Sequence, residues 1–118
     1  MLRREVVLEP GRHGRYYVDG FVDGRGPIRF CVDTGASMTY ISDEIADAIG
    51  LEWRSGFKRK TRGIIGEGDS WVVRARSIRI GDIEVKDPGD HDPLWCGVIP
   101  EMDLTGIDGL IGMSFLEK

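Results

Sequence analysis

The segment around residue 33 constrains the fold of this chain most, because an apolar run there ends abruptly in a carboxylate and a tight turn. The segment reads Phe30-Cys31-Val32-Asp33-Thr34-Gly35-Ala36-Ser37. Buried strands disfavour Asp, and an exposed turn does not need three apolar residues ahead of it. We therefore predict a buried strand that holds the Asp33 carboxylate rigidly at the edge of a sheet, where loops and functional sites lie.

Glycine is unusually frequent, with 17 glycines in 118 residues, which is about double the usual share. Glycines at this frequency indicate many tight turns and therefore many short strands. The length suits a single domain over residues 1–118, long enough to build a core without disulfides or a metal. We expect an all-β fold.

Charge and hydropathy narrow the classes of partner. The formal net charge is −4, which gives no basis for a nucleic-acid partner. No apolar run approaches the ~18 residues of a membrane span, and no signal-peptide pattern opens the chain. We expect no membrane contact from this segment. The lack of a signal-peptide pattern weakly favours the cytoplasm. A longer parent protein with a membrane anchor stays an open alternative.

Alternation of apolar residues predicts two hairpins. In the first, Tyr16–Val22 and Ile28–Val32 pair through a loop over residues 23–27, which delivers Asp33. In the second, Gly81-Asp82 forms a type II′ turn between two short strands. The expected pairs of the second hairpin are Ile80 with Ile83, Ile78 with Val85, and Arg79 with Glu84.

One short helix is predicted after Ser42, which is a suitable N-cap ahead of two acidic residues. Gly50 is placed to end this helix. Its apolar stripe is expected to contain Ile41, Ile45, Ala48 and Ile49. A second short helix is expected at the end of the chain.

Residues 57–73 carry several glycines between apolar segments and predict a long hairpin with a glycine-rich tip, although an ordinary flexible loop fits about as well. Several cations lie in and beside this segment and are either an anion-binding cluster or a solvated face. They are Arg54, Lys58, Arg59, Lys60 and Arg62.

Neither the cysteines nor the histidine-containing loop suggests a metal site. Cys31 and Cys96 are far apart in the sequence, and a disulfide between them stays open. His91 lies between Asp90 and Asp92, but the flanking prolines favour a solvated turn. We expect no metal and no cofactor.

Two motifs resemble the signatures of retropepsin-like aspartic proteases, in particular the single-domain bacterial type with one Asp-Thr-Gly-Ala motif per chain. The first is the segment 33–37, and about 75 residues later comes the second. The second reads Asp108-Gly109-Leu110-Ile111-Gly112-Met113-Ser114-Phe115-Leu116. The resemblance covers roughly residues 16–118. It implies a closed β-barrel with a glycine-rich flap hairpin and one or two short helices.

The resemblance also implies a catalytic mechanism. Hydrolysis of a peptide bond without a metal or a nucleophile needs a base to activate water and an acid to protonate the leaving group. Two adjacent carboxylates provide both by sharing one proton. This chain has a single Asp-Thr-Gly, so the second Asp33 would come from another copy across a two-fold axis.

The resemblance assigns roles to individual residues. Asp33 would be catalytic, and Thr34, Gly35 and Ala36 would support the active-site loop, with Thr34 bonding across the two copies. The flap over an extended peptide substrate would include Gly63, Ile64, Ile65 and Gly66. Leu110, Ile111 and Gly112 would support the Asp33 loop from below.

One departure from the family pattern keeps two alternatives open. Family members continue into a C-terminal strand that builds the dimer interface, and we expect this strand to be missing here. The chain is therefore either an aspartic endopeptidase or a catalytically inactive dimerisation or peptide-binding module on the same fold. A third reading is an unrelated β-barrel with Asp33 in an ordinary Asx turn.

Overall fold

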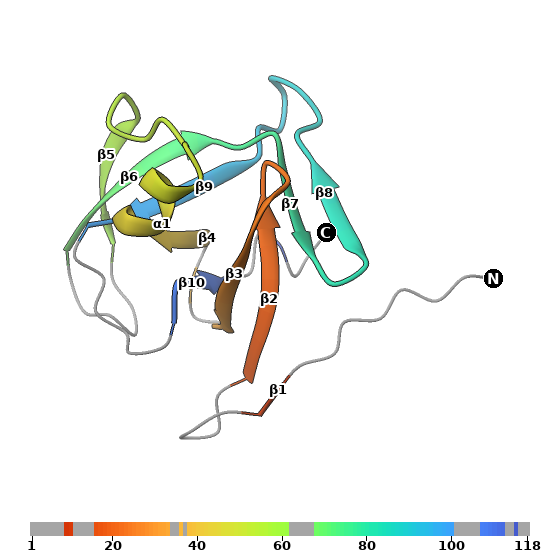
Figure 1. The fold of residues 1–118 in the computed structure, drawn as a ribbon. Helices are drawn as coiled ribbons and strands as arrows, with labels where there is room; N and C mark the ends of the chain where they lie inside the picture. Colours follow the sequence, from red (N-terminus) through yellow and green to blue (C-terminus); the bar gives the residue numbers. More distant parts are fainter. Residues whose placement is uncertain are drawn as a thin grey trace.

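A computed structural model describes residues 9–10, 16–33, 36, 38–61, 68–100, 107–112 and 115. Within these residues the chain is mostly strand, with one short helix, so the predicted all-β class is confirmed (Figure 1). The elements are β1 (Glu9–Pro10), β2 (Tyr16–Val22), β3 (Arg25–Val32), β4 (Thr39–Ser42), α1 (Asp43–Ala48), β5 (Phe57–Thr61), β6 (Gly68–Arg74), β7 (Ser77–Ile80), β8 (Ile83–Lys86), β9 (Trp95–Ile99) and β10 (Gly109–Ile111).

All of these strands belong to one sheet, in the order β5-β6-β9-β4-β10-β3-β2-β7-β8, with β1 beside β2. The pairs β10–β3 and β4–β9 are parallel, and the other pairs are antiparallel. β10 comes from the end of the chain and lies between β3 and β4. This insertion places the second sequence motif directly beside the first.

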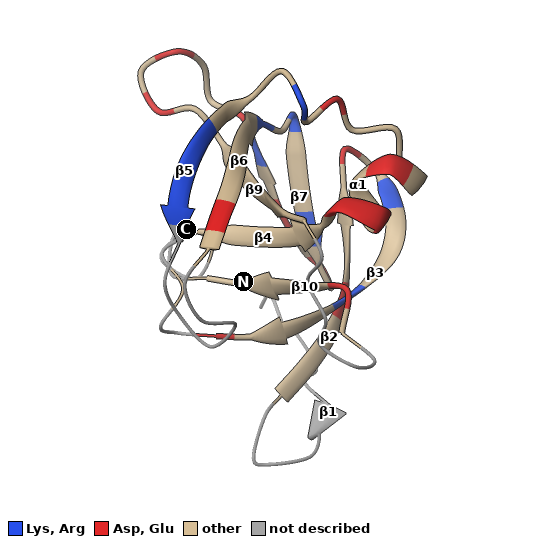
Figure 2. Cartoon of the chain, turned by 90° about the vertical axis from the view of Figure 1, so that its left-hand side faces the viewer, with Lys and Arg blue, Asp and Glu red and all other residues tan. Residues whose placement is uncertain are grey.

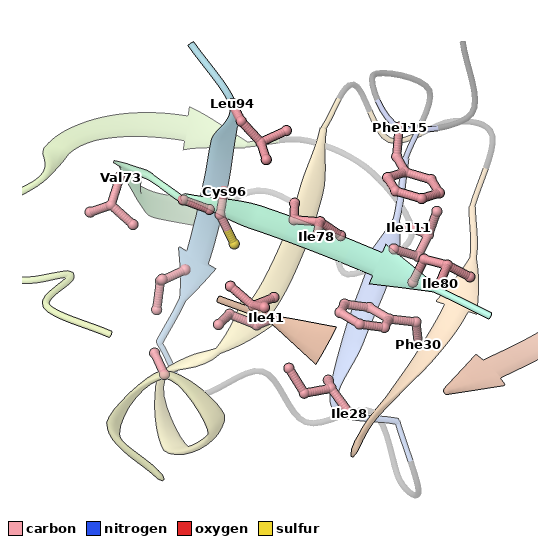
Figure 3. Packing of buried hydrophobic residues seen from close by; sticks show 14 of the residues in the cluster. Ile28, Phe30, Ile41, Val73, Ile78, Ile80, Leu94, Cys96, Ile111 and Phe115 are labelled. Atoms are coloured by element: carbon pink, nitrogen blue, oxygen red, sulfur yellow. The ribbon is translucent and has the colours of Figure 1, made fainter. Parts of the chain in front are cut away.

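The described strands do not form the closed barrel that the resemblance implied. The sheet has two edges, β5 and β8, and these strands do not pair with each other in the part of the chain that the structure describes. Only Ala75 and Arg76 separate β6 from β7 in the chain, although β9, β4, β10, β3 and β2 lie between them in the sheet. The sheet therefore curls until these two strands come close, without closing through hydrogen bonds between the described strands. Figure 3 shows Ile78 of β7 close to Ile41 of β4, and Ile80 of β7 beside Ile111 and Phe30 in the same cluster.

Both predicted hairpins are present. In the first, Val18 pairs with Phe30, and the turn is only Asp23-Gly24, because β3 begins earlier than expected, at Arg25. The second hairpin has the predicted register in all three pairs. Gly81 has a φ of 57° and Asp82 is not among the residues with positive φ, as a type II′ turn requires.

Helix α1 begins as predicted. The Ser42 Oγ accepts a hydrogen bond from the Ile45 N–H at 3.1 Å, and Gly50 follows the helix with a φ of 73°. The predicted stripe is wrong at Ala48, which is exposed, because Ala46 is the helical residue that faces the core. Apart from Phe115, the expected second helix lies outside the described residues.

The sheet is apolar on both faces of its central strands. The larger cluster, here the Phe30 cluster, fills the space inside the folded sheet and includes Ile28, Ile41 and Ile111. A second cluster, here the Leu110 cluster, lies on the opposite face, because neighbouring residues in a strand alternate between faces. Its members are Cys31, Ala36, Met38, Tyr40, Val72, Ile99, Ile107 and Leu110.

Candidate active site

The Asp33 backbone is held from two sides. Its N–H donates to the carbonyl of Ile111 at 3.0 Å, which continues the parallel pairing of β3 with β10. Its carbonyl accepts a hydrogen bond from the Ala36 N–H at 3.1 Å, which closes a tight turn. Asp33 itself is half-buried. The predicted strand end therefore presents this carboxylate from a backbone that neighbouring chain segments fix in place.

Gly112 lies against the loop that follows Asp33. A Cβ added to Gly112 would come within 2.2 Å of the Met38 carbonyl oxygen and 2.7 Å of the Ala36 carbonyl oxygen. Every other residue type carries a Cβ, and a Cβ cannot come this close to another heavy atom. The second motif therefore needs glycine at this position because the backbone after β10 packs directly on the backbone of the Asp33 loop.

Asp108 positions β10 between its two neighbours. Its Oδ2 accepts a hydrogen bond from the Arg29 N–H at 3.1 Å. Its own N–H donates to the Arg29 carbonyl at 2.8 Å, and its carbonyl accepts from the Ser42 N–H at 3.0 Å. Asp108 is not part of a second Asp-Thr-Gly, and its positioning role was not predicted from the sequence. An Asp directly before a glycine at the start of a short strand was the available signal.

The Leu110 cluster lies on the Asp33 side of the sheet. Alternation along β3 puts Cys31 and Asp33 on the same face, and Phe30 on the other. Tyr40 packs into this cluster over Gly97, where a Cβ would lie 2.4 Å from the Tyr40 ring. Met38 and Tyr40 were not identified from the sequence, because neither residue belongs to a motif. The sheet face that Asp33 shares is therefore lined by buried apolar side chains.

The two cysteines are thiols, not a disulfide. Cys31 belongs to the Leu110 cluster and Cys96 to the Phe30 cluster on the opposite face. Burial raises the pKa of the Cys96 thiol to about 12. At neutral pH Cys96 is therefore protonated and unreactive, and it acts as a small core residue.

The acidic loop around His91 is arranged around an arginine. Arg74 pairs with Asp87 and, at 2.6 Å, with Asp90. Across the described residues, no group of three or more His, Cys, Asp or Glu side chains could hold a metal ion. Within the same residues, no helix is long and apolar enough to cross a membrane.

Several predicted site residues lie outside the described residues. These are Thr34 and Gly35 of the active-site loop and Gly63, Ile64, Ile65 and Gly66 of the flap. The arms of the predicted hairpin are described, and β5 pairs antiparallel with β6 from Phe57↔Val72 to Thr61↔Gly68.

The fold and the two adjacent motifs are those of the retropepsin-like class of the aspartic protease family. Residues 18–115 match the family model described as aspartyl protease, and the chain belongs to this family.

Among solved structures, the chain is similar to a retropepsin-like aspartic protease from Rickettsia conorii, with a TM-score of 0.72 and 25% identity over 98% of this chain and 89% of that chain. It also shares its fold with the retroviral protease-like domain of Ddi1 from Leishmania major, with a TM-score of 0.52, 22% identity, and coverage of 86% of this chain and 74% of that chain. A comparison with curated proteins found no match.

Proposed function

We propose that this protein is an aspartic endopeptidase that acts as a homodimer with one Asp33 from each copy. The observation that carries the proposal is the double backbone anchor of Asp33, to Ile111 and to Ala36, in a chain of the aspartyl protease family. A carboxylate held in this way is positioned before substrate arrives, which lowers the cost of reaching the reactive geometry. Residues 1–118 would form one catalytic domain.

The chemistry requires the second copy. A single carboxylate cannot be base and acid in the same step, whereas two facing Asp33 side chains share one proton. The ionised Asp33 would take a proton from water, and the water oxygen would attack the scissile carbonyl carbon. The protonated Asp33 of the other copy would then protonate the amide nitrogen as its bond to the carbonyl carbon breaks, which releases the amine and leaves one proton on the dyad. Thr34 would bond across the two loops, and Gly35 and Ala36 would support each active-site loop.

The substrate we propose is an extended peptide. The β5–β6 hairpin supports a flap whose tip would include Gly63, Ile64, Ile65 and Gly66. The apolar side chains of the Leu110 cluster share the sheet face of Asp33. These side chains are buried within the chain, so the flap would make the contacts with the peptide.

The test is cleavage of a denatured protein mixture, with the new termini identified by mass spectrometry from acidic to neutral pH. Asp33→Asn should lower the rate about a thousandfold or more, because it removes both shared-proton carboxylates. Asp82→Asn, in the exposed β7–β8 turn, is the matched control and should cleave as the wild type does. Cleavage that survives Asp33→Asn would refute the proposal.

The rate should fall on both sides of an optimum, as expected of a pair that must hold one proton. If peptides bind but no bond is cleaved at any pH, the inactive peptide-binding module is the correct alternative.

A further inference from the structure

The two edges of the sheet differ sharply in charge. On β8, the exposed Lys86 and Glu84 pair at 3.7 Å, so this edge is balanced. On β5, three successive cations are exposed, Lys58, Arg59 and Lys60 (Figure 2). Single lysines on edge strands commonly protect against unwanted pairing. Three successive cations on β5 are more than such protection needs, and the lysine on β8 is balanced by a glutamate. The charge of β5 therefore needs a further explanation.

Only one of the three cations on β5 is neutralised by the described residues. Lys58 pairs with Asp69 at 3.3 Å and lies 5.5 Å from the centre of the Trp71 ring. Arg59 and Lys60 have no ion-pair partner in the part of the chain that the structure describes. Along the strand these two side chains point to opposite faces. A partner strand would therefore meet one unpaired cation on each face.

An exposed aromatic pair lies at the start of the same strand. Phe57 and Trp95 are 56% and 36% exposed, and their ring centres are 5.3 Å apart in an edge-to-face arrangement. Phe57 is opposite Val72 and shares its face with Arg59. A purely protective edge would gain nothing from an exposed phenylalanine, since exposed apolar surface favours association.

We propose that β5 is a docking edge for an extended acidic segment of another protein, which adds to the sheet as a further antiparallel strand. Main-chain hydrogen bonds to the open edge of β5 would supply affinity, and the side chains would supply selectivity.

The charges on β5 also predict the order of residues in the partner. Read from N to C in an antiparallel partner, two acidic residues would face Lys60 and Arg59. The partner position that faces Lys58 could hold any residue, because Asp69 already neutralises Lys58. An aromatic or large apolar residue would then face Phe57. Asp33 is not part of this docking edge, so docking can be measured in a chain that lacks the catalytic carboxylate.

The test measures binding of short fluorescein-labelled peptides to the full chain by anisotropy at low salt. The probe carries two adjacent glutamates, a threonine and a phenylalanine in that order, flanked by threonine and valine. One control peptide has lysines in place of the glutamates, and another has N-methylated backbone amides on the side that would face β5. All binding is measured with Asp33→Asn as well, so that cleavage and docking are scored separately.

The acidic peptide should bind at least about tenfold more tightly than either control peptide. The double variant Arg59→Glu/Lys60→Glu should lose about tenfold or more of this binding, and added salt should weaken binding to the wild type. The matched control is Arg76→Glu/Lys86→Glu, which changes the net charge equally at exposed positions near the other edge. It should bind like the wild type. Circular dichroism of each variant checks that the fold is intact.

Three results would overturn the inference. The first is equal binding of the acidic and lysine peptides, and the second is unchanged binding by Arg59→Glu/Lys60→Glu. The third is binding of phosphatidylserine vesicles, or self-association in sedimentation, that depends on Arg59 and Lys60 while the acidic peptide fails to bind. In that case β5 contacts a membrane surface or a second copy instead.

Discussion

The Asp33 N–H donates to the Ile111 carbonyl at 3.0 Å, and this bond joins two motifs that lie far apart in the sequence. The bond exists because β10 lies beside β3 in parallel register, with Ile111 opposite Val32. The candidate catalytic residue is therefore positioned by the last described strand of the fold. Changes on β10 should act on Asp33 without touching it.

Gly112→Ala should destabilise the fold strongly. The added methyl group would lie 2.2 Å from the Met38 carbonyl oxygen, so the backbone of the Asp33 loop must move. We expect a loss of about 2 kcal/mol or more in the free energy of unfolding, measured in urea. Gly68→Ala is the control, because nothing lies within 4 Å of its added Cβ. A Gly112→Ala variant as stable as Gly68→Ala would contradict the close packing.

Asp108→Ala should loosen β10, because it leaves the Arg29 N–H without its side-chain acceptor. The expected cost is about 1–3 kcal/mol in the free energy of unfolding. Asp108→Asn keeps an acceptor oxygen at this position and should recover most of the stability. If Asn is as destabilising as Ala, the carboxylate acts by its charge and not by this hydrogen bond.

Gly97 and Tyr40 should be energetically coupled. Gly97→Ala places a methyl group 2.4 Å from the Tyr40 ring and should cost about 1–3 kcal/mol, measured by urea unfolding. Tyr40→Ala removes the ring and leaves a cavity. In the double variant the new methyl group no longer clashes, so its total cost should be smaller than the sum of the single costs. Simple additivity would show that Gly97 is needed for another reason.

The Arg74–Asp87 pair should make stability depend on pH in the acidic range. The hydrogen bond from Arg74 lowers the pKa of Asp87 below its usual 3.8, and the Gly89 N–H contributes in the same direction. A carboxylate with a lowered folded-state pKa stabilises the fold above its unfolded pKa and loses this effect as pH falls through the folded value. Asp87→Asn should therefore be less stable than the wild type at neutral pH.

The difference between wild type and Asp87→Asn should shrink steadily below about pH 4 in thermal unfolding. Asp82→Asn, at an exposed turn, serves as the control and should show no such convergence. A difference that stays constant down to strongly acidic pH would mean that the effect of Asp87 does not come from its charge.

Local patterns predicted the local structure well. The pairs Ile80–Ile83 and Ile78–Val85 follow from alternation and a glycine-first turn, because adjacent strands and their turn involve only neighbouring residues. The Ser42 cap follows from the same kind of local signal. The helix stripe was wrong at Ala48, because the face that α1 buries depends on how it lies against β4 and β9, which its own sequence does not specify.

What the sequence determined by itself was the chemistry of the candidate site. It showed an Asp at the end of an apolar strand, a second motif with a glycine, and a single copy of Asp-Thr-Gly. Each of these depends on residue type and spacing alone. Together with the family resemblance, the single Asp-Thr-Gly led us to expect the second carboxylate from another copy of the chain.

Only the tertiary structure decided where these parts meet. The insertion of β10 between β3 and β4, the packing of Gly112 on the Met38 carbonyl, and the open basic edge of β5 all depend on contacts between distant segments. The described strands form a curled sheet with two edges, although a closed barrel had been expected. These contacts between distant segments form because the sheet buries two apolar faces at once. No single segment of the sequence specifies which distant segments it will contact.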